Sequence, residues 1–269
     1  MKKHYDFFSI ASALSRCLFT LATFIFVPNV ISILARLILG DSEAYKNATV
    51  PIMMASYVIV ILAFALIYKF SGQSLFEVIG LRKTNYSVAV SSGLLGVGAY
   101  GVVQAIVVVS TFILPKSWLS LQDDHASSIL SGGIVVAVIY TVLVAPFCEE
   151  LVFRGLITGA FSGSMPRILA IIIPAVLFSL IHLPSPIALF YTLLLGILLG
   201  FIRLRTKSLL PCILIHCLFN ATNYMLFIPR SIGLYIVWAV SIPFIIFAII
   251  NVLKKCPREN ASGTPLDRG

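Results

Sequence analysis

Charged residues are scarce in this sequence. Lysine, arginine, aspartate and glutamate together make up 11% of its 269 residues, whereas hydrophobic residues make up 59%. The mean hydropathy is +1.05. A soluble domain carries about a quarter charged residues, and it cannot bury so much apolar surface in one core. We therefore expect an integral membrane protein.

Other absences narrow the function further. The five cysteines form no C-x-x-C pair, so nothing indicates a disulfide framework or a zinc finger. The formal net charge is +9, but the basic residues lie in short clusters between apolar runs and form no patch interleaved with aromatics. That pattern is typical of membrane flanks, and we expect no nucleic-acid partner. No internal repeat is visible, which argues against transporters built from repeats.

The apolar runs predict the architecture. A helix needs about 20 apolar residues to cross a bilayer. We predict an all-α integral membrane protein with about eight transmembrane helices, at residues 15–39, 50–69, 87–114, 133–160, 167–183, 186–203, 208–228 and 233–253. The chain then divides into an N-terminal region of three spans (1–132), a catalytic core of four spans (133–228), and a last span with a polar tail (229–269).

The distribution of lysine and arginine predicts the orientation. With a cytoplasmic N-terminus, thirteen of the nineteen basic residues fall on the cytoplasmic side and four on the opposite side. Both termini are therefore predicted to be cytoplasmic. Residues 70–86 are interpreted as a short amphipathic segment on that surface, and residues 115–132 as the longest exterior loop. The first apolar run reads as a span and not as a cleaved leader, so we expect a bacterial or archaeal plasma membrane.

Few ionisable side chains remain inside the predicted spans. Of the ten acidic residues, only Glu149 and Glu150 lie in an apolar run. Of the four histidines, His182 and His216 lie within a run or at its end. An ionisable group in the bilayer costs several kcal/mol, so these four residues are candidates for function.

The spacing of these residues predicts which side chains face each other. Glu150 and Arg154 are four residues apart on one helix, so they can form an ion pair. This pairing leaves Glu149 as the carboxylate without a partner on its own helix. His216 and Asn220 are also four residues apart and therefore face the same way.

The depth of the polar groups predicts a single site. At about 1.5 Å per residue, Glu149, His182 and Asn220 each lie roughly 20 Å from the cytoplasmic end of their helix. We expect one site, buried among the fourth, fifth and seventh helices. Pro146 cannot donate a hydrogen bond to the Val142 carbonyl, so it is expected to kink the helix and open it near the glutamates.

These groups suit the hydrolysis of an amide bond. A carboxylate in a dry site is a stronger base than in water, so it can activate a water molecule. A histidine can position that water, and a second histidine with an asparagine can donate hydrogen bonds to the oxyanion. The known alternatives lack their residues, because the sequence has no G-x-G-D, no H-E-x-x-H and no G-x-S-x-G.

Three motifs resemble one protease family. They are E-E-L-V-F-R at residues 149–154, Phe178-x-x-x-His182 and His216-x-x-x-Asn220. Together they resemble the CAAX prenyl protease and bacteriocin-processing family, also called CPBP or Abi, and in particular its type II CAAX prenyl endopeptidases. The resemblance covers about residues 133–225.

The resemblance implies an eight-helix intramembrane endopeptidase. Some members of the family trim prenylated C-termini, and others are linked to bacteriocin maturation or immunity. Glu149 resembles the water-activating base, and His182 resembles its partner. His216 and Asn220 resemble the pair that stabilises the oxyanion.

The remaining motif positions have supporting roles in this interpretation. Glu150 and Arg154 resemble a supporting ion pair, and Phe153 and Phe178 are candidates for substrate binding. The expected substrate is a peptide or protein, with or without a prenyl group, that reaches the enzyme in the lipid bilayer.

The sequence leaves two questions open. Glu149, His182 and His216 are also a workable zinc ligand set. We favour a mechanism without a cofactor, because no two ligands have the H-E-x-x-H spacing. Two other functions remain as alternatives, namely a non-catalytic membrane protein for peptide binding or immunity, and a proton- or cation-coupled transporter. A transporter would need polar groups along a path through the membrane, whereas here they lie at one level.

Overall fold

The described part of the chain is entirely helical. The computed structural model describes residues 6–115, 117, 129–183, 185–222, 224 and 230–256, and these residues form helices and no strand. Most of the predicted exterior loop and the polar tail lie outside the described residues. The elements are α1 (Phe7–Leu39), α2 (Glu43–Phe70), α3 (Leu75–Val78), α4 (Tyr86–Ile113), α6 (Ile134–Val138), η1 (Ile139–Val144), α7 (Ala145–Glu150), η2 (Leu151–Ile157), α8 (Thr158–Phe161), α9 (Arg167–Leu180), α10 (Pro186–Thr206), α11 (Leu210–Thr222) and α12 (Arg230–Lys255).

Five of these elements form one continuous helix. The segments α6, η1, α7, η2 and α8 follow each other without a break over Ile134–Phe161, and we call this stretch the central helix. Its two η segments are π-helices, in which hydrogen bonds span five residues and not four.

Two helices begin several residues before their predicted spans. Asp6 Oδ2 accepts a hydrogen bond from a backbone N–H at the start of α1 (3.4 Å), and Ser42 Oγ does so at the start of α2 (3.2 Å). These caps satisfy N–H groups that would otherwise lack a partner, so the helices can begin in polar sequence at Phe7 and Glu43.

The structure supports six membrane spans by length and composition. Within the described ranges, six helices are long and apolar enough to cross a bilayer, and they correspond to six of the eight predicted spans. The other two predicted spans contain α9 and α11, which are apolar but only 14 and 13 residues long. At about 1.5 Å per residue, such a helix is near 20 Å, shorter than the roughly 30 Å hydrocarbon core. The count of eight crossings therefore stays a prediction.

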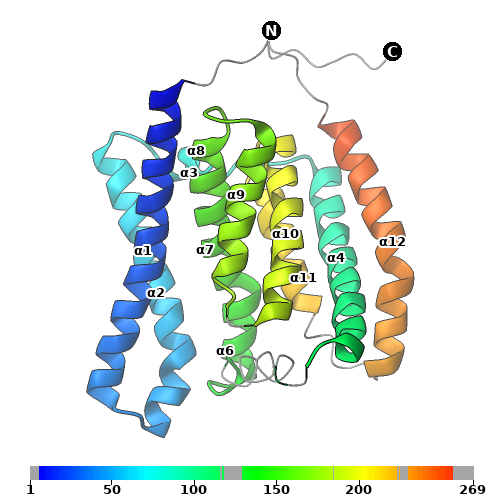
Figure 1. The fold of residues 1–269 in the computed structure, drawn as a ribbon, viewed down its shortest axis with the longest axis horizontal. Coiled ribbons are helices and arrows are strands. Elements are labelled where there is room, and N and C mark those ends of the chain that lie inside the picture. The colour runs from blue at the N-terminus through cyan, green and yellow to red at the C-terminus, as the bar shows by residue number, and fades with distance from the viewer. Residues whose placement is uncertain are drawn as a thin grey trace.

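The helices form a bundle with the central helix inside it. Figure 1 shows the α1–α2 hairpin on one side and α4 with α12 on the other, with the central helix, α9, α10 and α11 between them. Helix α1 begins and α12 ends at the same end of the bundle, which we call the terminal end. The opposite end, where α6 lies, is called the far end.

The outer surface of the bundle is apolar. Large hydrophobic side chains are widely exposed there, for example Ile38 at 81% and Phe112 at 85%. Exposed apolar area on this scale is stable only in contact with lipid. Together with the long apolar helices, it identifies an integral membrane protein.

Small residues allow α4 to approach its neighbours closely. A Cβ atom added at Gly96 would clash with the backbone carbonyl of Ile215 in α11, and one added at Gly98 would lie 2.9 Å from Ser241 O in α12. This close packing fixes the position of α11, which carries His216 and Asn220.

We predict that Gly96→Ala destabilises the fold. The added methyl group meets a rigid backbone oxygen, and overpacking of this kind costs about 1–3 kcal/mol. The melting temperature of the detergent-purified protein should therefore fall. Gly159→Ala is the matched control, since a Cβ there has nothing within 4 Å. Equal melting temperatures for the two variants would contradict the close approach of α4 and α11.

Candidate active site

The central helix carries both glutamates between its two π-helical segments. Glu149 and Glu150 are the last two residues of α7. Before them, the Ala145 N–H donates to the Tyr140 carbonyl, five residues earlier. Continuing this register would pair the N–H of residue 146 with the Thr141 carbonyl, but Pro146 has no N–H.

Asn220 takes the place of the missing backbone donor. Its Nδ2 atom in α11 donates to the Thr141 carbonyl at 2.8 Å. Thr141 Oγ1 in turn lies 2.9 Å from the hydroxyl of Tyr224. The sequence predicted that Pro146 leaves the Val142 carbonyl without a backbone donor. In the π register, the carbonyl without a backbone donor is that of Thr141. One N–H of the Asn220 amide remains for another acceptor.

Glu150 is fully buried and is held by two basic side chains. Its Oε1 atom accepts a hydrogen bond from Arg154 Nη1 at 2.8 Å, one turn further along the central helix. The same oxygen lies 2.9 Å from His216 Nδ1 in α11. The side chains of Glu150 and Arg154 are 0% and 1% exposed. The expected ion pair is therefore present, and α11 contributes a third member.

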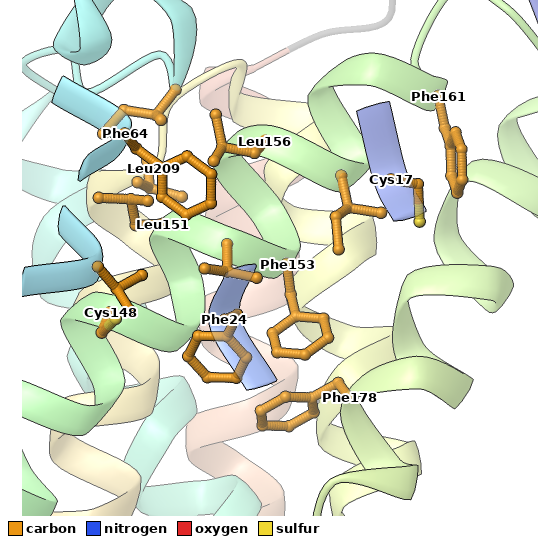
Figure 2. Packing of buried hydrophobic residues seen from close by; sticks show 14 of the residues in the cluster. Cys17, Phe24, Phe64, Cys148, Leu151, Phe153, Leu156, Phe161, Phe178 and Leu209 are labelled. Carbon is orange, nitrogen blue, oxygen red and sulfur yellow. The ribbon is translucent and has the colours of Figure 1, made fainter. Parts of the chain in front are cut away.

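Aromatic rings enclose the ion pair. The Arg154 guanidinium lies 4.4 Å from the centre of the Phe178 ring in α9, a cation–π contact. Figure 2 shows Phe24, Phe153 and Phe178 close together in the core, and their rings meet edge to face with centroids 5.7 Å and 5.3 Å apart. Burial in this apolar surrounding strengthens the attraction between Glu150 and Arg154 and also makes each charge depend on its partner.

Glu149 differs from Glu150 because it borders an open space. A cavity of about 440 Å³ is lined by Glu149, Phe178, His182, His216 and Asn220. Glu149 Oε2 lies 3.8 Å from His216 Nε2, so His216 bridges the two glutamates with its two ring nitrogens. Five of the predicted site residues, contributed by the central helix, α9 and α11, thus meet at one cavity.

His182 lies just beyond the end of α9. Its Nδ1 atom is 2.8 Å from the Phe178 carbonyl, which orients the ring from within its own helix. The Phe178 ring stands edge to face with both histidines, with centroids 4.9 Å from His182 and 5.8 Å from His216. Phe178 therefore sets the distance between the two histidines.

Phe153 lies away from the cavity. It is fully buried among core side chains and is not part of the cavity wall. Its expected role in substrate binding therefore has no support from its position, whereas Phe178 does line the cavity.

Several cavity residues are not recognisable from the sequence pattern. Tyr140 and Thr141 on the central helix, Tyr191 and Thr192 on α10, and Tyr224 after α11 all line the cavity. Tyrosine and threonine are common in apolar helices, so their presence in a span carries little signal. The one feature of the sequence that could have indicated a role at the site is the position of Thr141 and Tyr224, which lie two helical turns and one helical turn from motif residues.

The geometry does not assemble a metal site. Among the residues that the structure describes, no three His, Cys, Asp or Glu side chains are grouped so that they could hold a metal ion. Glu149 and His216 are neighbours, but one His216 nitrogen already contacts Glu150. The alternative zinc set of Glu149, His182 and His216 lines one cavity but is not preassembled around a metal position, and the mechanism without a cofactor stays a prediction.

A comparison with known proteins identifies the segment that carries the site. Residues 131–222 match the family model of type II CAAX prenyl endopeptidase Rce1-like proteins. The resemblance found in the sequence motifs is thereby confirmed over the central helix, α9, α10 and α11. The Rce1-like family is a protease family, so the match supports a membrane-embedded endopeptidase that acts on a peptide or protein. No curated protein and no solved structure matches the chain.

We predict that Arg154→Ala strongly destabilises the protein. The change leaves Glu150 buried without its main cation, and breaking a buried pair in this way costs about 3–5 kcal/mol. Thermal unfolding of the detergent-purified variant should show the loss. The double variant Glu150→Gln with Arg154→Met should recover most of it, because both charges are then removed. Wild-type stability of Arg154→Ala would mean that Glu150 is uncharged or reached by water.

Proposed function

We propose that the protein is an intramembrane endopeptidase in which Glu149 activates the attacking water. The observation that carries the proposal is the difference between two adjacent buried carboxylates. Glu150 is paired with Arg154 and contacts His216 Nδ1, whereas Glu149 faces the cavity. Two neighbouring acids with different surroundings are typical of sites in which one supports the structure and the other exchanges protons.

The proposed reaction begins with proton transfer to Glu149. A water bound between Glu149 and the peptide gives up a proton to the carboxylate, while its oxygen attacks the carbonyl carbon. The resulting oxyanion accepts hydrogen bonds from Asn220 Nδ2 and from His216 Nε2, when the ring is in its imidazolium form. Glu149 then passes the proton to the leaving nitrogen, and the C–N bond breaks. His182 is proposed to position the water at the cavity edge.

The cavity also supports the choice of substrate. Aromatic side chains of Tyr140, Phe178, Tyr191 and Phe219 line it beside the polar groups. Such a wall suits apolar side chains of a peptide or an attached prenyl chain. A protein that only binds such a peptide would have the same cavity, and turnover separates this alternative from a protease.

We propose that eight helices cross the membrane, with both termini in the cytoplasm. In the described chain, the terminal end carries most of the basic residues, which are Lys69, Arg82, Lys83, Arg167, Arg203, Arg205, Lys207, Lys254 and Lys255. The far end carries Arg36, Lys46 and Arg230, and the first two are each paired with an acidic side chain. The positive-inside rule supports a cytoplasmic terminal end, in the plasma membrane of a bacterium or archaeon.

This orientation gives the cavity a defined side. Its wall includes Leu130 just before the central helix, Ile134 at its start, His182 after α9 and Tyr224 after α11, all of which belong to the far end. In the proposed orientation, the cavity therefore faces away from the cytoplasm.

We predict that Glu149→Gln abolishes peptide cleavage without unfolding the protein. The amide has nearly the same shape but cannot take a proton from water. A fluorogenic farnesylated C-terminal peptide, and the same peptide without the prenyl group, would be incubated with detergent-purified protein. Glu77→Gln is the control, because it removes an exposed carboxylate far from the cavity. Cleavage by Glu149→Gln at the wild-type rate would disprove the role of Glu149. A strong chelator should leave the cleavage rate of the wild type unchanged. Inhibition by the chelator would instead support the zinc-dependent mechanism.

The orientation can be tested with a membrane-impermeant maleimide. A Leu130→Cys variant in a Cys217→Ser background places a thiol at an exposed position of the cavity wall, 46% exposed in the native residue. It should react in intact cells. Native Cys256, at the terminal end, should react only in inverted membrane vesicles. The reverse pattern would overturn the orientation while leaving the proposed chemistry untouched.

A further inference from the structure

A second cavity lies at the terminal end of the bundle. It has a volume of about 400 Å³ and is bordered by α1, α2, α3, the central helix, α9 and α10. Among the described residues of its wall, five are basic and Glu77 is the one that is acidic. The basic residues are Arg16, Arg82, Arg167, Arg203 and Lys207. None of these residues takes part in the site at the far end.

Arg203 forms the innermost basic group of this cavity. Its side chain is partly buried and donates two hydrogen bonds to backbone carbonyls, from Nε to Arg154 O at 3.1 Å and from Nη2 to Ile79 O at 3.0 Å. Gly80 makes room for it, because a Cβ there would lie 2.6 Å from Nη2. The guanidinium is thus held in place by dipoles that leave its charge intact.

Three of the arginines in the cavity wall lack a nearby carboxylate in the part of the chain that the structure describes. Among the described residues, no carboxylate lies within 4 Å of the guanidinium groups of Arg82, Arg167 or Arg203. Basic residues that only mark a membrane boundary can spread apart into water, whereas here five of them border one cavity. Mutual repulsion of these groups favours a bound anion.

The type of basic group indicates which anion fits. Four of the five groups are arginines, whose planar forks match the oxygens of phosphate and can bind it through paired hydrogen bonds. Basic pockets between transmembrane helices on the cytoplasmic side are suited to phosphate head groups of lipids. Arg16 on α1 and Arg167 on α9 are exposed in the cavity wall, so a head group from the surrounding membrane could reach them.

We propose that this cavity is a binding site for a phosphate group, carried by an anionic lipid or present as a free ion. The bound phosphate contacts Arg82 and Arg167 at the entrance and the charge of Arg203 at the inner wall. The proposal stands apart from peptide hydrolysis, because it concerns different residues at the opposite end of the bundle.

The test compares two double variants of the full-length protein. Arg82→Gln with Arg167→Gln removes two exposed charges from the cavity, and neither side chain forms an ion pair with another described residue. Lys254→Gln with Lys255→Gln removes the same charge from the terminal end outside the cavity. Each protein would be placed in phosphatidylcholine nanodiscs, and binding of added phosphatidylglycerol or of inorganic phosphate would be measured by native mass spectrometry.

The cavity variant should bind at least about tenfold more weakly than the wild type, because each lost guanidinium removes a charge-assisted hydrogen bond. The lysine variant should bind like the wild type. Binding of phosphatidylglycerol alone would identify a lipid site, and binding of inorganic phosphate with similar affinity would identify a free-phosphate site. Equal weakening in both variants would mean general attraction to a basic surface and would overturn the proposal, as would no binding of either probe.

Discussion

A carboxylate inside a membrane bundle is stable only where other groups replace the water that it has lost. Glu150 is in this position, and the replacement comes from two directions. Arg154 approaches from its own helix at 2.8 Å, and His216 approaches from α11 at 2.9 Å. Because Arg154 also lies over the Phe178 ring, the central helix, α9 and α11 are fixed together around a single buried charge. The position of Glu149 beside the cavity follows from this arrangement.

Much of this site could be predicted because it depends on spacing within single helices. The four-residue interval between Glu150 and Arg154 is sufficient to predict their ion pair. The same interval placed His216 and Asn220 on one face, and both line the cavity with His182 and Glu149. These residues could be recognised in the sequence because few other ionisable side chains lie in the apolar runs.

The parts that could not be predicted depend on contacts between helices. Helical spacing gives the direction of His216 but not the rotation of α11 relative to the central helix, so its bridge between Glu149 and Glu150 was not foreseen. The π-helices have no sequence signature of their own. Their register is stable because distant side chains bind the backbone carbonyls, as Asn220 does at Thr141. Helix starts were misplaced where capping side chains extended helices into polar sequence.

Arg203 connects the basic cavity to the helix segment that carries the buried ion pair. Its Nε atom binds the carbonyl of Arg154, the residue whose side chain neutralises Glu150. Its Nη2 atom binds Ile79 in the connection between α2 and α4. The backbone of Arg154 therefore contacts a side chain that lines the basic cavity, whereas the side chain of Arg154 forms the buried ion pair with Glu150.

The two π-helical segments have a consequence for how this chain can change in evolution. Loops usually absorb insertions and deletions, because their ends can adjust. Within the central helix, loss of one residue from η1 would return the backbone to the α register and turn everything before it by about 100° relative to Glu149. The Thr141 carbonyl would then lose its hydrogen bond to Asn220, and Tyr140 would no longer line the cavity. The length of this stretch is consequently as constrained as the identity of its glutamates.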